Sequence, residues 1–455
     1  MSRRNRKTSD PDNDTIIMDL ISNQLPMNDP ANPSSSAPHE SPDQRMQAAL
    51  NLYRNLIDDQ SWSIDITALW QYRLAQVRKM IDASGFAGVV LYDPVNIRYA
   101  TGTSTSPVFS LHFRDRYCFI GAHGPVVFFE KPHWRHLTEG SGLVGEVRDR
   151  ISCRGATGGA DIDGNIARWI GEIGDLVDSY GAGGRRLAMD HCEPALLRAL
   201  ESKGYTVCEA QEPMERIRAI KSAEELDCMR VALAVTEYGM QKMQDVLRPG
   251  VTENYLWSIL GGNNIEYGGE WLECRLLTSG PRTNPWLQEA SDRPVQAGEV
   301  VAFDTDIIGP FGYCADISRT FFCGPGTPTP RQKAMYALAR EELAHNTELL
   351  QPGRTLQEIA QRAFAVPAEY KENSYAFVAH GIGLCDEWPN CYQLEILEER
   401  GEGDIVIEAG MTLCVESYIG ETGGPDGIKL EEQVLVTESG PVTLSRFPFE
   451  TAMAG

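Results

Sequence analysis

The chain has 455 residues, 42% of them hydrophobic, and its 64 acidic residues outnumber its 41 basic ones to give a net charge of −23. So acidic a chain repels phosphate backbones and anionic lipid surfaces, which excludes general nucleic-acid binding and docking on an anionic membrane. No apolar run reaches the roughly 18–20 residues of a membrane span, and none follows the basic start at 1–14, so neither a span nor a secretory signal is expected.

The spacing and number of the eleven cysteines indicate whether the chain forms disulfides. Their number is odd and they form no C-x-x-C pair. This pattern is typical of free thiols in a reducing environment, so we expect the protein to be cytoplasmic.

The order of patterns along the chain divides it into three parts. Residues 1–45 are rich in Ser, Pro, Asn and Asp, and we expect a mobile N-terminal arm there. The alternative is that this arm packs on a partner subunit. Residues 46–213 alternate between helical and strand patterns, which predicts an α/β domain, and residues 214–455 follow a boundary near Pro213. The first domain is predicted to contain helices over 68–84 and 161–177 and strands over 87–91, 117–120, 126–129 and 186–189.

The second domain carries an internal repeat. The segment LRPGVT at 247–252 recurs as LQPGRT at 350–355, each time ahead of a helical pattern. A capping box at Ser222 predicts the start of the helix before the first segment, and Thr355 begins a second capping box. Such self-similarity indicates two copies of one structural unit.

Each copy of the repeat carries two acidic residues at equivalent places. Asp304 and Glu416 lie six residues after a glycine, at the end of an apolar strand pattern, and Asp316 and Glu431 lie four residues after another glycine. Asp306 is two residues beyond Asp304, so both side chains are expected on one face of a strand, with Asp316 on its antiparallel neighbour. Isolated buried carboxylates are costly, and so convergent a set needs a cation to neutralise it.

These five carboxylates, together with His380 between glycines, predict a metal site. An oxygen-rich set with one imidazole suits Mn²⁺, Fe²⁺, Co²⁺ or Zn²⁺, and bridging carboxylates hold two such ions roughly 3.5–4 Å apart. The competing interpretation is a set of solvated acids on a very acidic protein, which the apolar flanks of the set disfavour.

The same residues carry a family resemblance. The order Asp, Asp, His, Glu, Glu, with GYCADISRTF around Asp316 and GIKLEEQVLVT around Glu431, resembles the methionine aminopeptidase, prolidase and creatinase superfamily. The segments LYDPVNIRYATG (91–102) and IRAIKSAEEL (217–226) extend the resemblance to its two-domain members. It implies an α/β (α+β) architecture, in which an N-terminal creatinase-like domain precedes a pseudo-twofold pita-bread metal-binding domain.

Departures from the peptidases of that superfamily indicate one branch of it. Two histidines that the peptidases use are missing, since His345 and His380 are the only ones beyond residue 191 and Asp386 takes the place of one. General-acid help to a leaving peptide nitrogen is therefore poorly provided for. The segments FDTD (303–306), ISRT (317–320), HGIGLCDEWP (380–389) and KLEEQVLVT (429–437) resemble the dimethylsulfoniopropionate lyases of the DddP type.

That resemblance implies a cytoplasmic, usually dimeric enzyme that releases dimethyl sulfide and acrylate and depends on two divalent metal ions, with iron the metal most often implied. It carries over Asp386 as the base and Tyr375 as a substrate-contacting aromatic. The implied metal ligands are Asp304, Asp306, Asp316, His380, Glu416 and Glu431.

The chemistry of such a lyase agrees with the residues. A base must remove the proton next to a carboxylate, and a carboxylate in a partly apolar wall gains the basicity for this. The leaving group is a sulfonium cation, which aromatic faces attract, so Tyr375, Trp388 and Trp286 are candidate substrate contacts. Alternatively, Tyr375 and Trp286 are core aromatics and Asp386 is a hydrogen-bond partner of His380.

Other functions stay open at this point. The wall at 102–117 lacks a Trp that the lyases carry, which allows a related β-substituted carboxylate as substrate. An Xaa-Pro dipeptidase or creatinase-like hydrolase of the same fold is the second reading, and a binding module without metal is the third. In the leading interpretation the partners are a small zwitterionic substrate and a second copy of the chain, with no nucleic acid and no membrane.

Overall fold

The computed structural model describes residues 46–453, and they lie within one compact unit that spans residues 43–455. The predicted arm at 1–45 lies outside the described residues. The secondary structure confirms the mixed α/β character expected from the sequence.

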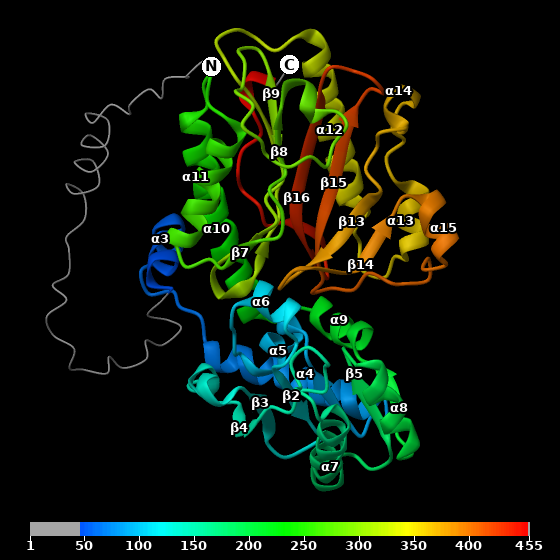
Figure 1. Cartoon of the computed structure of the whole chain (residues 1–455). Coiled ribbons are helices and arrows are strands. Elements are labelled where there is room, and N and C mark those ends of the chain that lie inside the picture. The colour runs from blue at the N-terminus through cyan, green and yellow to red at the C-terminus, as the bar shows by residue number, and fades with distance from the viewer. Residues whose placement is uncertain (1–45, 454–455) are drawn as a thin grey trace, which may run out of the picture. The chain divides into compact units, whose positions relative to one another are not determined.

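The first domain is built on a six-stranded sheet with the order β4-β3-β2-β1-β5-β6 (Figure 1). The two predicted strands at 117–120 and 126–129 are β2 and β3, which form an antiparallel hairpin, whereas β1 pairs with β5 in parallel. The central strands β1, β2 and β3 are short and buried throughout, as expected of a sheet covered by helices, whereas the edge strands β4 and β6 are partly exposed. They are β1 Gly88–Leu91, β2 Tyr117–Ile120, β3 Val126–Glu130, β4 Val144–Asp149, β5 Arg186–Met189 and β6 Thr206–Glu209.

Helices cover both faces of this sheet. The long helix α7 presents Trp169 and Ile173 to one face, and α4 presents Leu69 and Val77 to the other. The two helices predicted over 68–84 and 161–177 are therefore confirmed, each within a few residues. The helical elements of this part are α3 Gln47–Ile57, α4 Ile66–Ala83, α5 Pro94–Thr101, α6 Pro107–His112, η1 Pro132–Thr138, α7 Ile162–Tyr180, α8 Pro194–Ser202 and α9 Gln211–Ala219.

The connection to the second domain runs through α9. Pro213 is the third residue of this helix, and α10 begins shortly after it, at Ala223. The capping box predicted at Ser222 is present, because its side chain accepts from the backbone of Glu225 while the Glu225 carboxylate accepts from the backbone of Ser222.

The second domain contains three antiparallel sheets. Two have three strands, with the orders β12-β9-β8 and β11-β10-β7, and one has five, with the order β14-β13-β15-β16-β17. Figure 1 shows α10 and α11 on the side of β7 and β8, and α12 against β15 and β16. The strands are β7 Trp271–Leu272, β8 Leu277–Ser279, β9 Val300–Phe303, β10 Ile307–Ile308, β11 Cys314–Ala315, β12 Arg319–Phe322, β13 Phe377–Ile382, β14 Asp386–Tyr392, β15 Thr412–Gly420, β16 Gly427–Thr437 and β17 Gly440–Thr443.

The internal repeat is present as structure. Each LxPGxT segment ends one helix and starts the next, so that Thr252 caps α11 and Thr355 caps α13. The glycines of both segments adopt a positive φ, 93° at Gly250 and 88° at Gly353, which only glycine adopts without strain. The helical elements of this part are α10 Ala223–Val246, α11 Glu253–Glu266, η2 Gly280–Thr283, η3 Pro310–Gly312, α12 Pro330–Leu349, α13 Leu356–Arg362, α14 Ala368–Lys371, α15 Leu394–Arg400 and η4 Thr451–Met453.

A chain of buried hydrogen bonds joins the sheet of the first domain to β14 of the second. Asn96 donates to Asp190 at 3.1 Å and accepts from Arg218, whose Nε donates to Glu387 at 2.7 Å. Glu387 also pairs with Lys221 at 2.8 Å. The strand that carries Asp386 is thereby held by both domains.

Two further expectations concern composition. All eleven cysteines are free thiols in the structure. Among the described helices, none has the length and apolarity needed to cross a bilayer.

The buried charges around Glu387 generate a stability prediction. Glu387→Gln leaves Arg218 and Lys221 buried without their counter-charge, and breaking such a pair is expected to destabilise the protein by about 3–5 kcal/mol. Thermal and urea unfolding measure the change. The control Glu395→Gln removes an exposed partner of Lys371 and should cost less than about 1 kcal/mol. Equal effects of the two variants would contradict the role given to the buried pair.

Candidate metal centre and active site

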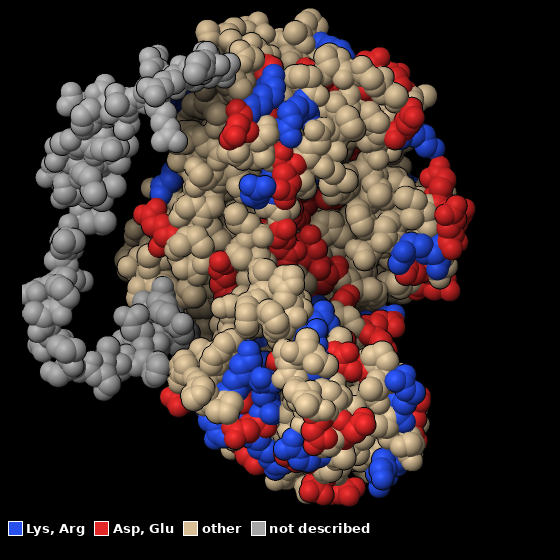
Figure 2. All heavy atoms as spheres, in the orientation of Figure 1, with Lys and Arg blue, Asp and Glu red and all other residues tan. Residues whose placement is uncertain are grey.

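Asp and Glu side chains gather in a hollow in the middle of the face that Figure 2 shows. The oxygen atoms of the five carboxylates predicted as ligands form overlapping sets, within each of which the candidate ligand atoms lie no more than 4.8 Å apart. The structure therefore brings together all six predicted ligands, including His380. The three sets are Asp316 with His380, Cys414 and Glu431; Asp304 with Asp306 and Asp316; and Asp304 with Glu416 and Glu431.

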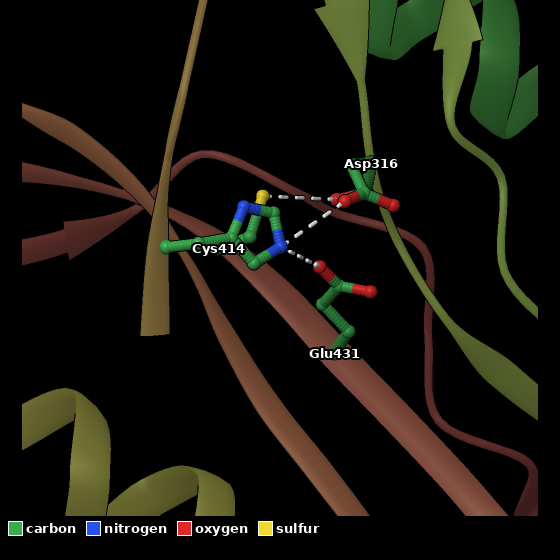
Figure 3. A group of neighbouring side chains, drawn as sticks. Asp316, Cys414 and Glu431 are labelled. Carbon is green, nitrogen blue, oxygen red and sulfur yellow. Dashed lines mark hydrogen bonds and ion pairs between the residues drawn. The ribbon is translucent and has the colours of Figure 1, made fainter. Parts of the chain in front are cut away.

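The C-terminal half of the site is arranged by strand pairing. Glu416 on β15 and Glu431 on β16 lie directly opposite each other, and His380 on β13 is opposite Cys414 on β15. Directly paired residues of antiparallel strands project to the same face, so these side chains meet. Figure 3 shows Cys414 and Glu431 turned toward Asp316.

The N-terminal half is arranged by a break in a strand. The expectation that Asp304 and Asp306 share one face of a continuous strand is wrong, because β9 ends at Phe303 and β10 begins at Ile307. Asp306 has a φ of 37°, a left-handed conformation that is uncommon for any residue but glycine. The predicted antiparallel neighbour is present, since β10 pairs with β11 and Asp316 follows β11 directly. The break turns Asp304 and Asp306 toward Asp316.

The distances around His380 fit a shared metal ion. Its Nε2 lies 3.4 Å from Glu416, 3.6 Å from Asp316 and 3.7 Å from Glu431. Two ligand atoms that are each about 2.1 Å from one ion and about 110° apart are about 3.4 Å from each other. The Oε1 atom of Glu431 is buried without a hydrogen-bond partner. An unpartnered carboxylate oxygen facing an imidazole nitrogen is the arrangement expected of two ligands of one metal ion.

The electrostatics of the group also call for cations. Burial, followed by the neighbouring carboxylates, raises the pKa values of Asp306 and Asp316 well above their usual range. Burial alone would lower the pKa of His380, but the nearby carboxylates outweigh it and raise that pKa. Bound divalent ions reverse this situation, since they favour ionised carboxylates and a neutral imidazole.

Asp386, the predicted base, begins β14 at the exposed side of the site. Its carboxylate reaches solvent although protein surrounds it closely on its other sides. This enclosure raises its pKa to about 6, with His380 lowering it and the acids of the site raising it. Glu273 is an exposed neighbour whose own pKa is raised to about 7 by desolvation and by Asp386. Asp386 and Glu273 are thus two neighbouring carboxylates on the solvent-exposed side of the site, which we call its entrance.

The predicted aromatic contacts lie in two different places. Tyr375 and Trp286 share one apolar cluster, and the ammonium of Lys429 lies 5.1 Å and 5.9 Å from their ring centres. Trp388, in contrast, lies on β14, packs against the core cluster and has the guanidinium of Arg216 4.6 Å from its ring centre. Only Tyr375 and Trp286 therefore adjoin the carboxylates.

The segment at 102–117 contributes to a small pocket at the junction of the two domains. Ser104, Thr105 and Pro107 line it together with Trp271 and Leu384, two residues before Asp386. The predicted N-terminal wall is therefore next to the entrance of the site.

Sequence reasoning missed several residues of the site. Lys429 pairs with three of the carboxylates, Cys274 donates to Asp306 at 2.6 Å, and Ser318 donates to Asp304 at 2.6 Å. Cys414 and Lys429 each precede a predicted ligand glutamate by two residues on the same strand. The period of two along a strand was the signal that would have found both.

The ligand geometry generates a prediction about metal content. Glu416→Gln removes one charged ligand. Changes to residues that only support the ligands of a metal site typically weaken metal binding about 10–100-fold, so the affinity for Mn²⁺ should fall by more than this. Bound metal after dialysis and a Mn²⁺ titration measure this. Glu342→Gln is the matched control, because Glu342 is buried nearby and accepts from Ser417 at 2.6 Å but lies outside the three ligand sets. Loss of metal from both variants would count against a role specific to Glu416.

Comparison with known proteins places the chain among relatives. Residues 227–438 match metallopeptidase family M24, and residues 73–220 match the creatinase/prolidase N-terminal domain. Dimethylsulfoniopropionate lyase DddP of Roseobacter denitrificans is 37% identical over 398 residues, covering 86% of this chain and 88% of the relative. The DddP lyase of Roseovarius nubinhibens is 36% identical, covering 86% and 89%.

A solved structure shares the fold. The prolidase from Thermococcus sibiricus superposes with a TM-score of 0.68 at 20% identity and covers 86% of this chain and 99% of its own. This agrees with the creatinase-like and pita-bread domains expected from the sequence. The matched models and the near full-length likeness to two lyases show that the chain belongs to metallopeptidase family M24, in its branch of DddP dimethylsulfoniopropionate lyases.

Proposed function

We propose that the protein is a metal-dependent carbon–sulfur lyase that cleaves dimethylsulfoniopropionate by β-elimination to dimethyl sulfide and acrylate. The observation that carries the proposal is Asp386, an exposed carboxylate with a raised pKa beside predicted ligand acids that are buried or, for Asp306, half-buried. The two lyase relatives support the choice of substrate.

In this proposal two divalent ions are held by Asp304, Asp306, Asp316, His380, Glu416 and Glu431. Iron is the metal we expect, although the same ligands suit Mn²⁺, Co²⁺ and Zn²⁺. When bound, such ions supply Lewis-acid chemistry, because they bind the carboxylate of the substrate and make its adjacent C–H bond more acidic.

Asp386 then acts as the general base. It takes the proton from the carbon next to the substrate carboxylate, and the electron pair of that C–H bond forms the C=C bond of acrylate. The bond between the β-carbon and sulfur breaks, and its electrons leave with neutral dimethyl sulfide. Because Asp386 reaches solvent, the proton passes to water and the base is restored.

The sulfonium group of the substrate is recognised near the entrance. Tyr375 and Trp286 supply aromatic surface beside the carboxylates, and Glu273 with Asp386 adds negative charge that attracts an onium group. Trp388, the third aromatic candidate from the sequence, lies on β14 two residues after Asp386 and packs against the core, so in this proposal it supports the strand of the base.

Peptide hydrolysis is the second candidate, because the solved relatives of this fold include prolidases. His345 cannot supply the missing peptidase histidine. It lies on α12, outside the candidate ligand sets, and its Nε2 is hydrogen-bonded to the backbone carbonyl of Arg362 at 2.7 Å.

We propose further that the protein is a cytoplasmic homodimer. The free thiols support the compartment. The exposed apolar side chains of Val108, Phe109 and Leu111 on α6 offer surface for a second copy of the chain.

The lyase proposal is tested with Asp386→Asn. Loss of a positioned base should lower kcat/KM for dimethylsulfoniopropionate by about 10²–10⁴-fold while the bound metal stays unchanged. Headspace gas chromatography for dimethyl sulfide, with acrylate measured in parallel, gives the rates. Asp149→Asn changes an exposed acid of the first domain and should leave them unaltered. Wild-type protein with full metal that releases no dimethyl sulfide, but hydrolyses proline dipeptides, would replace the lyase by the second candidate.

The pKa of the base predicts the pH dependence of the reaction. Only ionised Asp386 accepts a proton, so log kcat/KM should rise by one unit per pH unit on the acid side and level off above the pKa. The pKa is about 6 without metal, and bound cations lower it, which sets the midpoint at or below pH 6. Rates from pH 4 to 8, with metal content checked at each pH, measure it. A flat profile down to about pH 4 at constant metal content would remove Asp386 from the role of base.

A further inference from the structure

Lys429 is a buried cation inside the group of predicted metal ligands. It lies on β16 two residues before Glu431, and its side chain has no exposed surface. Its Nζ is 3.1 Å from Asp304 and 3.0 Å from Glu431, and it also pairs with Glu416. A hydrogen bond to Ser318 at 2.7 Å completes its contacts with polar groups of the site.

The carboxylates that Lys429 contacts form the third of the three candidate ligand sets, Asp304 with Glu416 and Glu431. The ammonium therefore fills that set. The set around His380, whose Nε2 also lies 3.4 Å from Oε1 of Glu416, and the set made of Asp304, Asp306 and Asp316 remain for metal ions.

Each of the two glutamates uses one carboxylate oxygen for Lys429 and the other for the side of the predicted metal site. Glu416 and Glu431 each turn Oε1 toward His380 and Oε2 toward Lys429. Lys429 thus binds the glutamates from the side away from the imidazole, and the space beside His380 stays free of the ammonium.

The charges of the site add up in the same way. Five ionised carboxylates carry five negative charges, and Lys429 cancels one of them. The remaining four match two divalent ions. In the described part of the chain, no other Lys or Arg forms an ion pair with any of the five.

We propose that Lys429 is a positioning residue that acts as the permanent cation of the metal centre. It compensates part of the charge of Asp304, Glu416 and Glu431 in the metal-free protein and leaves a site whose charge suits two divalent ions. This inference rests on the metal centre of the proposed function, and it concerns metal binding rather than turnover.

The physical consequence differs between the metal-free and metal-bound protein. Without metal, Lys429 faces five negative charges, and its removal leaves buried carboxylates uncompensated. With two divalent ions bound, the five carboxylates and the two ions together present Lys429 with a net charge of −1. Lys429→Met should therefore destabilise the metal-free protein more than the metal-bound protein. By thermodynamic linkage, the affinity of Lys429→Met for Mn²⁺ should then be at least about tenfold higher than that of wild type.

The experiment compares wild type, Lys429→Met and the control Lys221→Met, which removes another buried lysine that pairs with Glu387 outside the ligand sets. Unfolding temperatures with and without Mn²⁺, and calorimetric titration with Mn²⁺, are the readouts. We expect two Mn²⁺ per chain in wild type. We also expect a larger loss of stability in metal-free than in loaded Lys429→Met, and equal losses in the control.

Two outcomes would overturn the inference. If Lys429→Met behaved like the control, with unchanged Mn²⁺ affinity, Lys429 would be structural only. If wild type bound one Mn²⁺ and the variant two, the ammonium would occupy a metal position. Wild type that binds no Mn²⁺ would instead refute the metal centre itself. Should metal-free Lys429→Met not fold, Lys429→Arg keeps the charge and should retain the wild-type affinity within about threefold, whereas a change of tenfold or more would contradict the charge role.

Discussion

The burial of like charges in one place is the constraint on which the rest of this structure depends. Carboxylates removed from water either take up protons or collect cations, because an uncompensated buried charge is costly. Here the fold gathers five of them and supplies His380 and Lys429 from the strands alongside. The apolar strands, the paired glutamates and the free oxygen of Glu431 all follow from the need to hold this group in a fixed arrangement.

The two halves of the repeat meet that need by different means. In the C-terminal half, regular pairing of β15 with β16 sets Glu416 against Glu431. In the N-terminal half, the chain leaves the strand at Asp304 and returns to it at Ile307, with Asp306 in a left-handed conformation. Asp306 is thus aimed by a backbone irregularity, held in part by the thiol of Cys274. Irregular backbone of this kind is typical of functional sites.

Much of this arrangement was predictable from the sequence, because repeats, capping boxes and spaced acids are local patterns. The helix starts at Ser222 and Thr355 and the convergence of the six predicted ligands came from such patterns. The break after Phe303 did not, since apolar residues resume at Ile307 and the alternation of Asp304, Thr305 and Asp306 is also compatible with one continuous strand. Nor did the separate places of Trp286 and Trp388, because the direction of a side chain beyond its strand face depends on neighbours distant in sequence.

The hydrogen-bonded chain from Asp190 through Asn96 and Arg218 to Glu387 has a consequence for the evolution and engineering of this architecture. It crosses from one domain to the other and ends beside Asp386, so the two domains are not independent modules. A chimera that joins this catalytic domain to the first domain of a distant relative inherits Arg218 only if the graft includes α9. A joint placed between Asn96 and α9 keeps Arg218 but removes its acceptor Asn96, so the two domains are constrained to change together.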